Sequence, residues 1–272
     1  MKKRIVALFL TVVMLFTCAM LGGCGEKEKA PEADKGSVAV IVNNALKKNE
    51  QLDAISAVMK MEMSMKMEGM TMDMPMTAKI KAKNLNKDGM VASVDMTMSV
   101  MGQEIAMQMY QEGEWAYMVM EDMKYKVSAK DMEGEMDYAQ STKDMLKEIP
   151  EELFKNVKIV EGKDGSKKVT INFPSDKFTE LYNDVIKDIN SNNGTETDEF
   201  KISDAVVTVT MVDDYVTVFD MSFKMDMTVE GIKTTTTAKV SITYDDPGKE
   251  VVITPPEGYQ NFEEVNMNEN IF

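Results

Sequence analysis

Methionine alternates with charged or polar residues over long stretches, and this alternation restricts the fold more than any other feature of the chain. Every odd position from 59 to 67 is Met, with Lys, Glu or Ser between. After Gly69, residues 70–83 carry Met, Ala or Ile at every second position. A period of two separates two strand faces, whereas a helix would place positions i and i+2 on different faces and bury the lysines. The pattern predicts antiparallel strands with one apolar face, although methionine by propensity favours helices.

The rest of the chain fits a meandering sheet with helices. Residues 38–50 have helical spacing of their apolar side chains, and residues 130–155 and 175–190 are also predicted to be helical. A hairpin is expected over 157–173, around Gly162 and Gly165. Further strands are expected at 94–100, 104–111, 115–120, 124–127, 205–212, 219–229 and 234–244. The predicted fold class is α+β, mostly antiparallel β, with about eleven strands whose length should make the sheet curve.

The N-terminus has the three parts of an export signal. Residues 1–4 are basic, residues 5–20 are almost entirely apolar, and Leu21-Gly22-Gly23-Cys24 precedes a polar stretch. The cysteine after Leu-Gly-Gly resembles the lipobox of bacterial lipoproteins. This resemblance implies cleavage before Cys24 and attachment of lipid to its thiol. An uncut signal anchor, or an ordinary signal peptide with an incidental cysteine, are the alternatives.

Charge and composition exclude several classes of function. The formal net charge is −15, and removal of residues 1–23 takes Lys2, Lys3 and Arg4 away, which leaves about −18. Such a surface repels nucleic acid and anionic head groups, so attachment to the membrane should come from the lipid on Cys24. There are no histidines, and the two cysteines are Cys18, inside the signal, and Cys24. We therefore expect no enzyme, no cofactor, no metal site built on His or thiolate ligands and no disulfide.

The order of parts resembles the lipoprotein-carrier class of LolA-like and LppX-like domains, and uncharacterised secreted lipoproteins of Gram-positive bacteria. The resemblance rests on the Cys24 motif, the methionine strands, the segment Met101-Gly102-Gln103-Glu104 and the tail Thr254-Pro255-Pro256-Glu257-Gly258-Tyr259. It implies a curved half-barrel sheet with helices on the concave face, and an acyl-chain cavity between them. The implied organisation is a signal peptide at 1–23, a lipidated N-terminus and flexible tether at 24–36, a half-barrel domain at 37–259, and a C-terminal tail at 260–272.

Methionine supplies 29 of 272 residues, and three interpretations of this excess compete. The methionines could form an ordinary core, in a structural or interaction module at the cell surface. They could instead form a soft lining for a lipid or other apolar ligand, since Met is flexible and polarizable. Thioethers also suit Cu(I), the least favoured case because no His or thiol strengthens a site. The predicted lining is Met61, Met63, Met65, Met72, Met74, Met76, Met96, Met98, Met107, Met109, Phe219, Met221, Phe223, Met225 and Met227.

Overall fold

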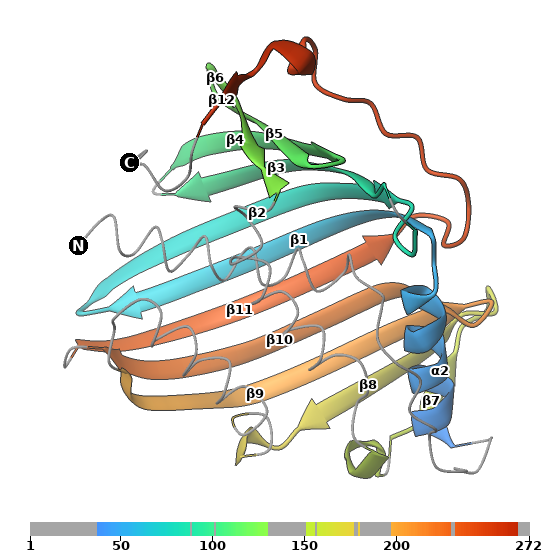
Figure 1. Ribbon diagram of the computed structural model, residues 1–272. Helices are drawn as coiled ribbons and strands as arrows, with labels where there is room; N and C mark the ends of the chain where they lie inside the picture. Colours follow the sequence, from blue (N-terminus) through green and yellow to red (C-terminus); the bar gives the residue numbers. More distant parts are fainter. Residues whose placement is uncertain are drawn as a thin grey trace.

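A single twelve-stranded sheet dominates the fold (Figure 1). The structure is a computed structural model that describes residues 37–87, 89–100, 102–129, 151–155, 157–176, 179, 197–229 and 232–265. The strands are β1 (Ala54–Met67), β2 (Met70–Lys83), β3 (Val91–Val100), β4 (Gln103–Glu112), β5 (Trp115–Met120), β6 (Met123–Ser128), β7 (Ile159–Glu161), β8 (Lys167–Phe173), β9 (Thr197–Val212), β10 (Tyr215–Val229), β11 (Ile232–Tyr244) and β12 (Glu263–Glu264).

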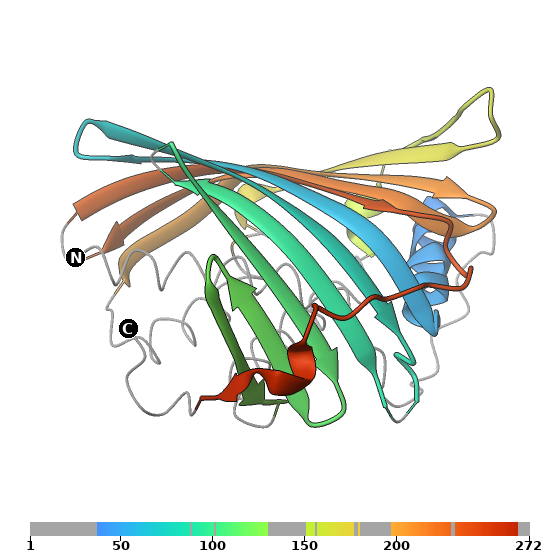
Figure 2. The same cartoon turned by 90° about the horizontal axis from the view of Figure 1, so that it is seen from above.

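The sheet joins two meanders through its central pair of strands. Its order is β12-β6-β5-β4-β3-β2-β1-β11-β10-β9-β8-β7, so the first and last long strands lie side by side. β1 and β11 are antiparallel over eleven residue pairs, from Ala57 opposite Tyr244 to Met67 opposite Thr234. Figure 2 shows that the sheet arches, with helix α2 (Val38–Glu50) on the concave side. The predicted fold class, an open antiparallel half-barrel, is confirmed.

Helix α2 confirms the first predicted helix, and it is fixed at both ends. The Ser37 hydroxyl accepts a hydrogen bond from the backbone N–H of Val40 and caps the N-terminus. At the C-terminus, the Asn49 side-chain amide exchanges two hydrogen bonds with the backbone of Val216, each 2.9 Å long. The ammonium group of Lys48 also lies 3.9 Å from the centre of the Tyr215 ring. These contacts hold α2 against the start of β10, where it closes one end of the apolar core.

Three predicted parts of the chain fall wholly or mainly on residues whose structure is not described. The predicted helix at 130–155 overlaps the described residues only at its end, where Glu151–Phe154 form the short 3-10 helix η2. Most of the predicted helix at 175–190, and all of residues 1–36, lie outside the described residues. Within the part of the chain that is described, no helix combines the length and the apolar character needed to cross a membrane.

β9 begins eight residues earlier than the sequence pattern indicates, because a bulge interrupts its alternation. Ser222 of β10 pairs with Val206, but Lys224 pairs with Ser203, so β9 has one extra residue at this point. Asp204 adopts φ 54° within the bulge. Buried positions are odd after the bulge, from Ala205 onward, whereas Ile202 is buried before it. The pattern that predicts a strand from 205 is therefore out of phase with the strand that precedes it.

The segment after β11 returns to the sheet. It runs along the ends of the strands, forms the 3-10 helix η3 (Tyr259–Asn261), and pairs β12 with β6 in parallel (Figure 1). The Tyr259 ring meets those of Tyr110 and Tyr117 edge-on, with centroids 5.2 and 4.9 Å apart. Phe262 is buried beside Tyr117. Tyr110 and Tyr117 face away from the methionines of β4 and β5, so this aromatic cluster covers the convex side of that edge.

The raised pKa values of two tyrosines, Tyr110 in the aromatic cluster and Tyr244 on β11, predict a loss of stability in alkali. Burial, followed by a hydrogen bond with Glu112, raises the pKa of Tyr110, and burial raises the pKa of Tyr244 to about 12. A folded-state pKa above the unfolded value of 10.0 favours the neutral phenol, so this stabilisation is complete below pH 10 and disappears as the pH rises through the folded pKa. The melting temperature should fall between pH 10 and 12 in a thermal scan. Tyr110→Phe should reduce that fall, and an unchanged slope would contradict the assignment.

Candidate ligand-binding face

The methionines gather on the concave face of the sheet because β1 and β2 are in register. Four consecutive cross-strand pairs join methionine to methionine, from Met61 opposite Met76 to Met67 opposite Met70. Met76 continues the row to Met98 on β3, and Met96 is opposite Met107 on β4. Directly opposed side chains have Cβ atoms ~4.5–5.5 Å apart, so these thioethers are immediate neighbours. The sequence predicted the strands and their meandering order, but not the register that places these side chains directly opposite one another.

All fifteen predicted lining residues are on one face of the sheet, which we call the methionine face. Met61, Met63, Met74, Met76, Met96, Met98, Phe219 and Met221 are buried there, and Met65, Met72, Met107, Met109, Phe223, Met225 and Met227 are half-buried. Strand β10 also contributes side chains to the methionine face. A register shift between Val216 and Val218 places Phe219 on this face. The predicted lining does not include Met59, which is completely buried on the same face.

Burial on this face decreases along the strands, away from α2. At the α2 end the side chains are small or branched and buried, as at Ala57, Ala78 and Ile242, and they belong to the same core cluster as Val42 of the helix. The middle of β1 and β2 holds buried methionines. Towards the β1–β2 turn, Met65, Met67 and Met72 become half-buried and Met70 is 64% exposed. The hairpin end thus presents large apolar side chains to solvent.

Two threonines interrupt the apolar surface at this hairpin end. Thr234 and Thr236 of β11 are buried on the methionine face, in line with Ala238 and Val240. Thr236 is directly opposite Met65 on one side and Met225 on the other. The alternation places both threonines on this face. Threonine is common in strands, so nothing in the sequence marked these two as buried polar groups.

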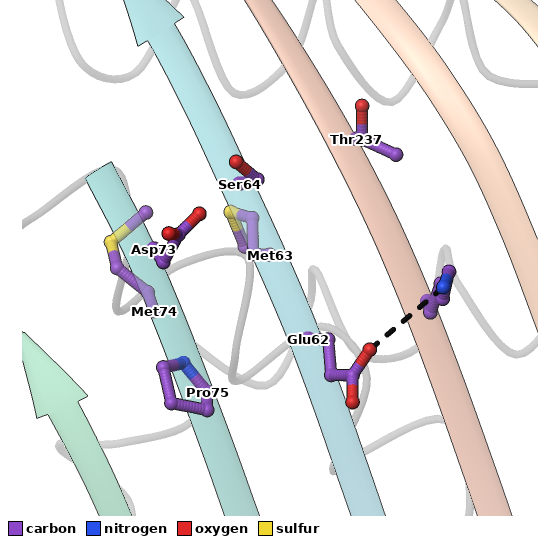
Figure 3. A pocket seen from close by; sticks show the side chains of 8 residues that line it. Glu62, Met63, Ser64, Asp73, Met74, Pro75 and Thr237 are labelled. Atoms are coloured by element: carbon purple, nitrogen blue, oxygen red, sulfur yellow. Dashed lines mark ion pairs between the residues drawn. The ribbon is translucent and has the colours of Figure 1, made fainter. Parts of the chain in front are cut away.

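The convex face of the same strands is polar. It has a depression of about 390 Å³ lined by residues that include Glu62, Ser64, Asp73, Pro75 and Thr237. Figure 3 shows these side chains. An ion pair of 4.0 Å joins Lys239 to Glu62 across the depression, and both side chains are more than two-thirds exposed. Exposed ion pairs of this kind contribute little binding or stability. We therefore place the candidate site on the opposite, methionine face.

A second polar contact on the convex face involves Asp226. Its carboxylate accepts hydrogen bonds from Thr235, at 2.6 Å, and from the Lys224 ammonium group, at 2.9 Å. The hydrogen bond from Thr235, followed by that from Lys224, lowers the pKa of Asp226. The described residues contain no group of three or more His, Cys, Asp or Glu side chains that could hold a metal ion. Ordinary salt bridges account for Glu62 and Lys239 in the depression, and for Asp226 and Lys224.

Comparisons with known proteins identify a family. LprF from Mycobacterium bovis has a similar crystal structure, with 13% sequence identity, coverage of 79% of this chain and 95% of that chain, and a TM-score of 0.43. A domain from Vibrio parahaemolyticus, described as an outer membrane lipoprotein-sorting protein domain, has 12% identity, coverage of 77% and 92%, and a TM-score of 0.27. No curated protein matches the chain. A family model matches residues 37–257, which is most of the chain, and the protein therefore belongs to DUF6612, a family of unknown function.

Proposed function

We propose that this protein is an exported, lipid-anchored and non-enzymatic binding protein whose methionine face holds an acyl chain or similar apolar ligand. The observation that carries the proposal is the row of paired methionines that runs from the buried core to the exposed hairpin end. Exposed apolar surface that is continuous with a core is typical of a binding site. Methionine suits such a site because it is unbranched and repacks around flexible partners at low cost.

The anchor in this proposal is the lipid on Cys24. With residues 25–36 as a tether, the domain would stay within ~40 Å of the membrane surface if the tether were extended. The acidic surface would not hold the domain against anionic head groups, so the ligand-binding face would remain free to receive a lipid. The proposed partners are thus the membrane, through the anchor, and one apolar molecule at the methionine face.

Native mass spectrometry tests the proposal. The mature chain, residues 24–272, is expressed without its signal, so that Cys24 stays unmodified. It is then purified without detergent. We expect a bound mass in the lipid range that organic extraction removes and that added single-chain phospholipid restores. A protein that carries no lipid and takes up none would contradict the proposal, and the methionine face would then be the core of a structural or interaction module.

The methionine pairs also favour a second candidate, Cu(I). Met61, Met76 and Met98 are successive neighbours across three strands, and three thioethers are a suitable ligand set for a soft monovalent ion. The same spectra, recorded after addition of Cu(I) under reducing conditions or of Ag(I), test it directly. A stoichiometric metal adduct that is lost in Met76→Leu would support this candidate, whereas adducts that are equally weak in both proteins would exclude it.

A further inference from the structure

Thr236 holds a buried polar group for which the described residues provide no hydrogen-bond partner. Its side chain is on the methionine face, the residue is 3% exposed, and its hydroxyl oxygen makes no hydrogen bond in the described structure. A buried hydroxyl without a hydrogen bond costs free energy, so such groups are rare in folded proteins and call for an explanation. A ligand that hydrogen-bonds to this hydroxyl would supply one.

The surroundings of Thr236 offer little to a water molecule. Its cross-strand neighbours are Met65 and Met225, whose thioethers are weak acceptors, and the next residue along β11 on the same face is Ala238. Thr234 is two residues away in the other direction, about 6.6 Å along the strand. A buried water needs two to four polar partners, and these side chains do not provide them. A ligand that is held in place by its own apolar part is therefore a better partner for the Thr236 hydroxyl than a water molecule.

The charges around the site indicate what kind of polar group this partner carries. The lysines of β1, β2 and β11 alternate with the apolar residues and therefore face the convex side, as Lys60, Lys79 and Lys239 do. Among the described residues of these strands, no lysine would therefore accompany a free carboxylate or phosphate buried beside Thr236, and an unpaired buried charge is costly. A neutral acceptor, such as the carbonyl oxygen of an ester, carries no such penalty.

We propose that Thr236 recognises the ester carbonyl of an acyl lipid, with its hydroxyl donating a hydrogen bond to the carbonyl oxygen. The acyl chain then lies along the methionine face beside the half-buried Met225 and Phe223, and the head group lies towards the exposed hairpin end. This inference rests on the proposed function and adds the class of ligand, an ester-linked lipid rather than a free fatty acid or a hydrocarbon. Thr236 is a specificity-determining residue in this arrangement.

The test compares two lipids that differ only at the carbonyl. Myristoyl lysophosphatidylcholine has an ester, and its O-alkyl counterpart of the same length has an ether in its place. Binding of each to the mature chain, residues 24–272, is measured by isothermal titration calorimetry below the micelle concentration. The wild-type protein should bind the ester about tenfold more tightly, as expected for one buried hydrogen bond. Thr236→Val should lose this preference and bind the ether as before.

Two further measurements make the test specific. Thr237→Val changes the neighbouring threonine, which is exposed on the convex face, and should keep the preference for the ester. Without ligand, Thr236→Val should melt about 2–4 °C higher, because it removes the unpartnered hydroxyl and retains the shape of the side chain. Equal binding of ester and ether by the wild-type protein, or an equal loss of both in Thr236→Val, would overturn the inference while the proposed function stands. Binding of neither lipid would overturn both.

Discussion

Met61→Ala is expected to lower the free energy of unfolding by about 3 kcal/mol. Met61 is 1% exposed, and it lies between Met76 on β2 and Val240 on β11. Truncation of a buried methionine removes its transfer free energy and leaves a cavity, which together cost ~2–5 kcal/mol. Urea denaturation, followed by circular dichroism, measures the change. A loss this large would make the centre of the methionine face close-packed core.

Two control variants separate packing from the mere presence of methionine. Met70→Ala removes a side chain that is 64% exposed at the β1–β2 turn and should change the free energy of unfolding by less than about 0.5 kcal/mol. Met61→Leu keeps a similar volume and should cost less than about 1.5 kcal/mol. If Met61→Ala cost no more than Met70→Ala, the interior beside β1 would not be filled by protein, and ligand space would extend into the centre of the sheet.

The sequence pattern predicts the strands of this fold well where alternation is unbroken. The registers between the first six strands are uninterrupted, and the predicted positions of these strands differ from the observed ones by a few residues at the ends. The phase of this alternation also places every residue of the predicted lining on one and the same face of the sheet. Side-chain period is a local property of a strand, so it can be interpreted without knowledge of the rest of the fold.

Features that depend on distant parts of the chain could not be predicted in this way. The pairing of β1 with β11 joins residues more than 160 positions apart, and no local pattern specifies it. The bulge at Asp204 reverses the phase of β9 and concealed its first eight residues. β12 has two residues, both Glu, and its place beside β6 depends on the aromatic contacts of Tyr259 and Phe262.

The candidate site shows the same division between local and distant information. Its methionines follow from the period of two, but the neighbours of each thioether follow from the register between strands. Thr236 illustrates the difference most clearly. The sequence places it on the apolar face, but only the burial and the hydrogen-bond geometry of the folded chain distinguish its hydroxyl from the others on β11. Recognition of a ligand therefore depends on information that alternation does not contain.

Cys24→Ser is expected to abolish lipid attachment completely. Cys24 lies outside the described residues, and the expectation rests on its position directly after Leu-Gly-Gly at the end of an apolar signal. A serine hydroxyl does not replace the thiol in forming a thioether, so the variant cannot carry the acyl chains. Mass spectrometry of the N-terminal peptide from cells that express the full chain measures this. The wild-type peptide should begin at Cys24 and carry the mass of its acyl chains.

Cys18→Ser is the matched control, because Cys18 lies within the apolar segment that processing would remove. This variant should give the same acylated peptide as the wild-type protein. A wild-type chain that retained residues 1–23 without added acyl mass would instead be held by an uncut signal anchor. In that case the domain would still stand outside the membrane on the tether of residues 25–36, and the proposed binding of an apolar ligand would be unaffected. The proposed anchoring and the proposed ligand binding are therefore independent of one another, and each has an experiment that can reject it alone.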